Sequence, residues 1–147
     1  MSDADFMGHY SPRLDEKGRL ALPARFREDL GERIVVTKGL DRCLTVYPHE
    51  TFKTQVLDRL AAGPTSSRAV RNLRRALLAH ASTEAPDRQG RITIPAVLRD
   101  YAGLDKDVVV IGQGDYLELW DSATFAEIEI SSDDSLDALD VDGGVLL

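Results

Sequence analysis

The chain has 147 residues, of which 43% are hydrophobic and 29% are charged, and this composition is typical of one soluble globular domain. No apolar stretch reaches the roughly 20 residues that a membrane-spanning helix needs, so we expect no membrane partner. A single cysteine, Cys43, excludes an intrachain disulfide framework and is expected to be a small buried apolar residue.

The net charge of −7 is distributed unevenly along the chain. From residue 127 to the end there are seven acidic residues and no Lys or Arg, which leaves 18 acidic and 18 basic residues before it. Such an acidic segment with few large apolar residues favours disorder, which we expect for residues 131–147. We expect residues 1–130 to form the folded domain. Because residues 1–126 are neutral overall, their charge does not exclude a nucleic-acid partner.

The N-terminal segment before Phe6 is acidic. It lacks both the basic region and the apolar region of a secretory signal. A cytoplasmic location is therefore expected.

Residues 6–52 have the pattern of a strand, a turn, a strand, a short helix and a β-hairpin. Residues 15–18, Asp-Glu-Lys-Gly, predict a turn, because the Asp side chain can close it and the Gly accepts a positive φ. Alternating leucines at residues 20–22 predict a strand. Residues 23–31 begin with Pro and end with Gly, as short helices often do. The hairpin turn is expected at residues 39–42.

Two helical segments are predicted next, at residues 49–63 and residues 66–81. The second has an apolar stripe, and four arginines occupy much of its remaining surface: Arg68, Arg71, Arg74 and Arg75. Either these arginines form an ordinary solvated helix face, or they reach nucleic acid or a neighbouring subunit.

The rest of the chain repeats the first half. Residues 14–24 match residues 86–96 at an offset of 72 residues, and residues 44–47 correspond to residues 117–120 in the second hairpin. We therefore predict two halves, 6–52 and 80–126, joined by a helical linker over 49–81. Because each half is too small to bury its own apolar face, a closed pseudo-twofold unit is favoured over an open solenoid. A short helix is expected to begin at Asp121.

Several segments together resemble the MraZ family over about residues 6–130. They are the two Asp-x-x-Gly-Arg turns, the Arg-Ala-Leu-Leu-Ala-His-Ala run at residues 75–81 and the Tyr-Leu-Glu-Leu-Trp-Asp run at residues 116–121. The resemblance implies a mainly β fold with short helices, an AbrB-like swapped-hairpin (double-split) β-barrel whose two tandem pseudo-symmetric halves come from one chain. The extra residues before Phe6 and the acidic C-terminal segment depart from the family pattern.

The resemblance also implies a function. It implies a sequence-specific DNA-binding transcriptional regulator that represses its own division and cell-wall gene cluster by binding tandem promoter repeats in double-stranded DNA. It implies a nucleoid-associated homo-oligomeric ring, an octamer or dodecamer. No enzyme activity, cofactor or metal is expected.

DNA binding requires cations at phosphates, and base reading most often uses Arg or Lys at guanine. The candidate DNA-binding residues are Arg19, Lys17, Arg91, Arg13 and Arg25. The candidate turn-shaping residues are Asp15, Gly18, Asp87 and Gly90.

Arg19 is the first candidate, because the family motif also points to it. Its alternative role is a buried or intersubunit ion pair, including one with the aspartate of its own motif. The second turn has Arg-Gln at residues 88–89 where the first has Glu-Lys at residues 16–17. The two halves therefore need not contribute equally to DNA binding.

Two other classes of function are alternatives to a DNA-binding regulator. For an enzyme, the histidines at 9, 49 and 80 lack metal-ligand spacing, and Gly-Gln-Gly at residues 112–114 lacks the third glycine of a dinucleotide fingerprint. An antitoxin-like or other protein-interaction module is the second alternative, since AbrB-like folds also occur in antitoxins with acidic tails. Antitoxins usually supply one half per chain, whereas this chain supplies two. The acidic segment here either maintains solubility or competes with phosphate for the basic loops.

Overall fold

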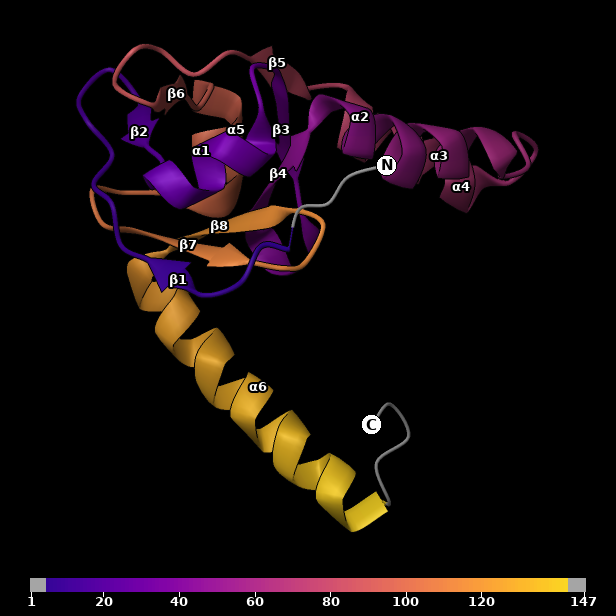
Figure 1. Cartoon of the computed structure of the whole chain (residues 1–147). Helices are drawn as coiled ribbons and strands as arrows, with labels where there is room; N and C mark the ends of the chain where they lie inside the picture. The colour runs from indigo at the N-terminus through magenta and orange to yellow at the C-terminus, as the bar shows by residue number, and fades with distance from the viewer. Residues whose placement is uncertain (1–4, 143–147) are drawn as a thin grey trace.

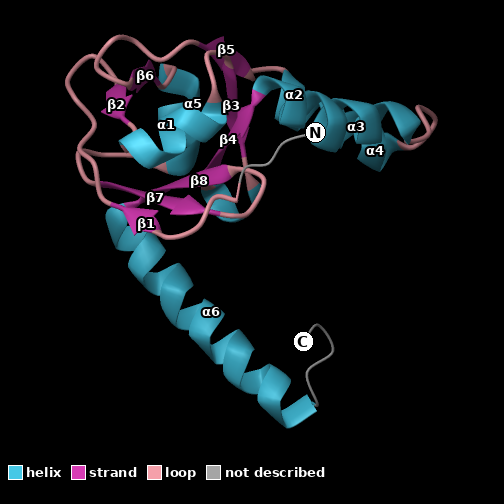
Figure 2. Ribbon diagram, in the orientation of Figure 1, coloured by secondary structure: helices cyan, strands magenta, loops and turns pink. Residues whose placement is uncertain are grey.

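The computed structural model describes residues 5–142 as two antiparallel sheets with helices around them (Figures 1 and 2). The strands are β1 (His9–Tyr10), β2 (Arg19–Ala21), β3 (Ile34–Lys38), β4 (Leu44–Pro48), β5 (Ser82–Glu84), β6 (Arg91–Thr93), β7 (Val108–Gly112) and β8 (Leu117–Asp121). The helices are α1 (Ala24–Leu30), the 3₁₀ turn η1 (Leu40–Arg42), α2 (His49–Phe52), the π-helical segment η2 (Lys53–Leu57), α3 (Asp58–Ala62), α4 (Arg68–Leu78), α5 (Ala96–Ala102) and α6 (Ser122–Asp142).

The larger sheet has the strand order β1-β7-β8-β4-β3-β5, and the smaller sheet pairs β2 with β6. The larger sheet is open, with β1 and β5 at its edges. The expected combination of β-sheets with short helices is confirmed, except that α6 is a long helix of 21 residues.

Two strand pairs join the halves, and each is centred on residues that the repeat makes equivalent. In the β2–β6 pair, Leu20 lies opposite Ile92, which is its counterpart at the 72-residue offset. In the β4–β8 pair, Thr45 lies opposite Glu118, its counterpart in the second hairpin. A residue can face its own counterpart in this way only near a twofold axis. The halves are therefore related by a pseudo-twofold axis that passes through both pairs.

One apolar core takes residues from both halves. The alternation of strands β2 and β6 turns Leu20 and Ile92 inward, and both are essentially inaccessible to solvent. Helices α1 and α5 lie between the small sheet and the large one in Figure 2, and they bury Phe26 and Leu98 in the same core. The main core is therefore shared by the two halves.

The outer face of the large sheet is covered by helices in two places. The arm (residues 49–78, α2 to α4) packs Phe52 and Val56 against Val35 of β3. At the other place, the first turns of α6 pack Phe125 and Ile128 near Trp120 of β8.

The acidic C-terminal segment differs from the expectation. Residues 131–142 continue α6 instead of being disordered, and residues 143–147 lie outside the described residues. The helix starts with an N-cap, since the Asp121 carboxylate accepts the backbone N–H of Thr124 at 3.3 Å, and Phe125 and Ile128 anchor its first turns. Once nucleated and anchored, a helix adds further residues at a low cost in free energy.

In the described part of the chain, no helix is long and apolar enough to cross a membrane.

Candidate nucleic-acid interface

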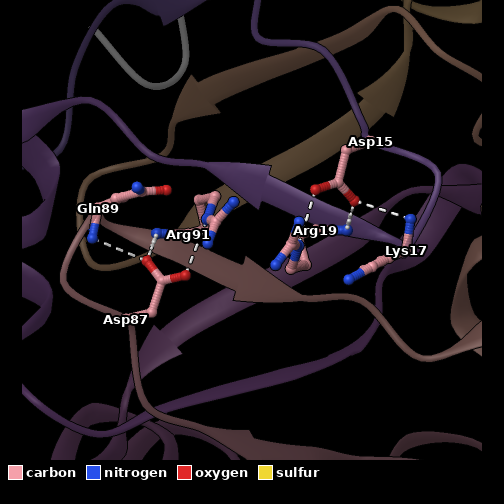
Figure 3. A network of polar contacts seen from close by, with 6 residues as sticks. All are labelled: Asp15, Lys17, Arg19, Asp87, Gln89 and Arg91. Carbon is pink, nitrogen blue, oxygen red and sulfur yellow. Dashed lines mark hydrogen bonds and ion pairs between the residues drawn. The ribbon is translucent and has the colours of Figure 1, made fainter.

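The turn at residues 15–19 is held by one carboxylate (Figure 3). Asp15 Oδ1 accepts the backbone N–H groups of Lys17 and Arg19 at 2.9 and 2.8 Å, and Asp15 Oδ2 accepts Nε–H of Arg19 at 2.7 Å. The Asp15 carbonyl accepts the backbone N–H of Gly18 at 3.0 Å. Asp15 therefore closes the turn and also fixes the arginine that follows it.

The turn at residues 87–91 repeats this geometry. Asp87 Oδ1 accepts the backbone N–H groups of Gln89 and Arg91, both at 2.9 Å, and Oδ2 accepts Nε–H of Arg91 at 2.8 Å. In both turns the backbone hydrogen bond from the arginine is the largest cause that lowers the pKa of the aspartate. Both carboxylates are therefore ionised at neutral pH and hold their arginines as ion pairs.

The register of β2 and β6 places the two motif arginines on one face. Arg19 lies opposite Thr93, and Arg91 lies opposite Ala21. Directly opposed residues share a face, as do residues two apart along a strand. Both arginines therefore project from the outer face of the ribbon, while the residues between them point into the core. Diagonal neighbours of this kind lie about 7–8 Å apart.

The two arginines keep donors available for a ligand. Their side chains are 30% exposed for Arg19 and 29% exposed for Arg91. Among residues 5–142, the Nη atoms of neither arginine take part in a hydrogen bond; only Nε does. A guanidinium held at Nε presents its terminal donors to an incoming acceptor.

Each turn is also fixed by the opposite half. Gly18 and Gly90 have φ values of +76° and +75°, which favour glycine. The Gly18 carbonyl accepts the backbone N–H of Ile94 at 2.8 Å, and the Gly90 carbonyl accepts that of Leu22 at 3.0 Å. The two turns therefore form one rigid unit across the pseudo-twofold axis.

The other three candidate cations are placed differently. Lys17 is exposed at the tip of the first turn. Arg13 is exposed on the segment leading into that turn and forms an ion pair with Asp107 at 3.7 Å. Arg25 lies on α1, where its guanidinium stacks 4.8 Å from the centre of the Phe26 ring. Of the three, only Lys17 belongs to the turn itself.

Arg88 was missing from the sequence-based candidates. It is exposed at the tip of the second turn. Because β2 and β6 are antiparallel, the two turns lie at opposite ends of the pair, as Figure 3 shows. Four cations therefore follow one another along this element, which we name the basic ribbon: Lys17, Arg19, Arg91 and Arg88. The sequence feature that could have identified Arg88 is the Arg-Gln pair of the second turn, which stands where the first turn has Glu-Lys.

The described residues 5–142 contain no group of three or more His, Cys, Asp or Glu side chains that could hold a metal ion. The basic ribbon offers fixed cations and hydrogen-bond donors on two antiparallel strands.

Sequence similarity supports the resemblance seen in the turn motifs. A family model described as "MraZ protein, putative antitoxin-like" matches residues 6–75 and residues 77–142. The chain belongs to the MraZ family. Each matched stretch contains one Asp-x-x-Gly-Arg turn and one hairpin of the large sheet. The second stretch also includes α6, whose residues 131–142 were expected to belong to the acidic tail.

Three MraZ relatives cover most of the chain. The "Transcriptional regulator MraZ" of Thermobifida fusca is 53% identical over 124 residues, which are 84% of this chain and 86% of the relative. That of Micrococcus luteus is 52% identical over 120 residues, 82% and 83% of the two chains. That of Salinispora arenicola is 47% identical over 141 residues, 96% and 97% of the two chains. The family is thus one of transcriptional regulators, which are not a class of enzyme.

Proposed function

We propose that the chain is a sequence-specific DNA-binding transcriptional regulator that reads DNA with the basic ribbon. The observation that carries this proposal is that Arg19 and Arg91 project from one outer face of a two-stranded ribbon. The major groove of B-DNA admits a two-stranded ribbon, and arginine is the side chain that most often binds guanine there, through O6 and N7.

The ion pairs within the turns support this role. Asp15 and Asp87 hold Arg19 and Arg91 at Nε, so the terminal donors are oriented before DNA binds. A side chain that is already ordered loses less conformational entropy on binding. The pseudo-twofold axis of the ribbon matches a short box with two guanines on opposite strands.

We assign the fold to the AbrB-like swapped-hairpin class, with halves 6–52 and 80–126 and the linker 49–81. Support comes from the two strand pairs that cross between the halves, β2–β6 and β4–β8. The ribbon then lies across from the open sheet, with α1 and α5 between them.

We further propose that the protein acts as a homo-oligomeric ring of eight or twelve subunits on tandem promoter repeats. It would repress its own division and cell-wall gene cluster from the cytoplasm, in association with the nucleoid. Family membership supports this assembly. A single ribbon with four cations binds weakly, whereas several linked ribbons on adjacent repeats multiply the effective concentration.

The test is fluorescence anisotropy on a duplex from upstream of the gene and on a scrambled duplex, over a series of salt concentrations. We expect preferential, salt-sensitive binding that is lost in Arg19→Ala. The matched control is Arg59→Ala, which removes an exposed arginine on α3 of the arm, away from the ribbon. Equal or absent binding by a well-folded protein would contradict DNA reading. It would favour an antitoxin-like interaction role, which copurification of a small partner would support.

A further inference from the structure

An arginine-lined hollow lies on the arm. Arg71, Arg74 and Arg75 of α4 line it together with Thr65, and its volume is about 250 Å³. Arg71 Nη1 donates to the carbonyls of Thr65 and Ser66 at 3.0 Å, which fixes one wall. Within residues 5–142, no ion pair includes any of the three arginines. A hollow lined by cations without counter-charges is suited to an anionic partner.

The chain carries a helix of opposite charge. Helix α6 contains no Lys or Arg, and Asp133, Asp134 and Asp137 are exposed on it. Beyond Ile128 the helix leaves the sheet and projects from the body of the molecule (Figure 1). Ile130 on this projecting part is 65% exposed.

Comparison of the two halves shows that α6 has no helix packed beside it within the described chain, unlike its counterpart in the first half. Helix α6 follows β8 as α2 and α3 follow β4, with Phe125 at the position of Phe52. In the first half α4 folds back beside the equivalent helix, and their apolar residues join one cluster. Figure 1 shows that α4 and α6 of one chain project in different directions, so they do not cover each other. A helix that covers α6 in the same way would therefore have to belong to a second molecule.

The charges of the two helices match in detail. With about 100° between successive residues, Arg71, Arg74 and Arg75 occupy about 100° of the α4 circumference, and the three aspartates occupy about 100° of α6. On α4 one arginine stands alone, and two adjacent arginines follow it three and four residues later. On α6 two aspartates are adjacent, and the single one follows. In an antiparallel arrangement the single residues face each other, as do the adjacent pairs.

We propose that α6 of one copy docks antiparallel on the arginine hollow of α4 in a neighbouring copy. Asp137 then faces Arg71, Asp134 faces Arg74 and Asp133 faces Arg75. The contact is head-to-tail, because each copy gives α6 and receives another, and such contacts close into rings. This inference rests on the oligomer of the proposed function and specifies its contact surface.

The same alignment explains an exposed apolar residue. Ile130 lies seven residues before Asp137, and Leu78 lies seven residues after Arg71, so the two side chains face each other. Leu78 already belongs to the apolar cluster of the arm. We favour a second copy over DNA as the occupant, because α4 lies far from the basic ribbon in Figure 1 and because the chain supplies the matching charges.

Charge exchange tests the proposal. The acid-reversed variant carries Asp133→Lys, Asp134→Lys and Asp137→Lys, and the arginine-reversed variant carries Arg71→Glu, Arg74→Glu and Arg75→Glu. Sedimentation velocity should show at least a tenfold weaker self-association for each variant alone. An equimolar mixture should recover the wild-type assembly, because each α6 then meets an α4 of opposite charge.

Two controls keep the result interpretable. The variant Glu28→Lys, Asp29→Lys, Glu32→Lys changes the net charge as the acid-reversed variant does, at exposed positions elsewhere, and should assemble like the wild type. If loss of the Arg71 hydrogen bonds unfolds the arginine-reversed variant, Arg74→Glu with Arg75→Glu replaces it. Wild-type assembly by each variant alone, or a mixture that fails to recover it, would overturn the proposal.

DNA binding separates this inference from the proposed function. The two variants keep the basic ribbon, so each should still prefer a duplex with a single box over a scrambled duplex. If charge exchange restores assembly but no form of the protein prefers the box, DNA reading fails and the contact between copies stands. If the preference is present and charge exchange fails, the reverse holds.

Discussion

Pairing of strands between the two halves leads to a quantitative prediction for Leu20→Ala. Leu20 is 0% exposed and lies opposite Ile92 at the centre of the ribbon. Truncation of a buried leucine costs about 2–5 kcal/mol, and we take about 3 kcal/mol because both sheets surround the site. With a urea dependence of about 2 kcal/mol per molar, the unfolding midpoint falls by about 1.5 M.

The only tryptophan of the chain reports on the half that is not altered. Trp120 lies on β8 in the second half, whereas Leu20 belongs to the first. We expect Trp120 fluorescence and far-ultraviolet circular dichroism to show one coincident transition, shifted by the same amount. Protein concentration is held constant, because self-association adds to the apparent stability.

A matched substitution calibrates the shift. Leu40→Ala removes the same atoms from a side chain that is 79% exposed in the hairpin turn, so its cost stays within about 0.5 kcal/mol. An unchanged Trp120 midpoint in Leu20→Ala, with a separate transition in circular dichroism, would refute the reasoning. It would mean that the halves unfold independently.

Three further predictions follow from single side chains. Gly18→Ala should lower the free energy of unfolding by about 1–3 kcal/mol, because φ is +76° and a Cβ would lie 3.0 Å from Cζ of Arg99. Gly103→Ala has open space around it, so it should lower the free energy of unfolding by only about 1 kcal/mol, the cost of a left-handed backbone for alanine; urea unfolding compares the two variants. Cys43 should resist thiol reagents until the protein unfolds, because its side chain is buried and burial raises the pKa of its thiol; reagent kinetics in urea check this. Burial raises the pKa of Tyr47 from 10.0 to about 12, so the stabilisation from its neutral phenol is complete below about pH 10 and is lost as the pH rises to about 12. Ultraviolet titration of the phenolate measures the pKa, and urea unfolding at several pH values measures the loss of stability.

Local sequence signals were sufficient for the elements of the site. The Asp and Gly of each motif have the side-chain and backbone properties that a tight turn requires, and the structure has turns at residues 15–18 and 87–90. The alternation at residues 20–22 and 92–94 indicates which residues face the core. These features depend only on residues close together in the sequence, so they can be predicted without knowledge of the tertiary structure.

Local sequence signals could not predict that Arg19 and Arg91 project from the same face of the ribbon. It depends on the register between strands that are 72 residues apart, and a slip of one residue would turn one arginine inward. The extent of α6 was missed for a related reason. Composition averaged over residues 131–147 indicates disorder, whereas the helix is set by contacts of Phe125 and Ile128 with the sheet.

The molecule combines a symmetric centre with asymmetric appendages, and the two parts suit different tasks. The repeat equivalence of Leu20 with Ile92 gives the ribbon an approximate dyad, which suits a DNA duplex whose strands are related in the same way. Helix α4, with its arginines, follows only the first hairpin, and the acidic α6 follows only the second. If both halves carried the same appendage, like charges would meet at every contact between copies. The insertion of α4 into one half only is therefore consistent with the proposed head-to-tail contact between copies, while the basic ribbon keeps its approximate dyad.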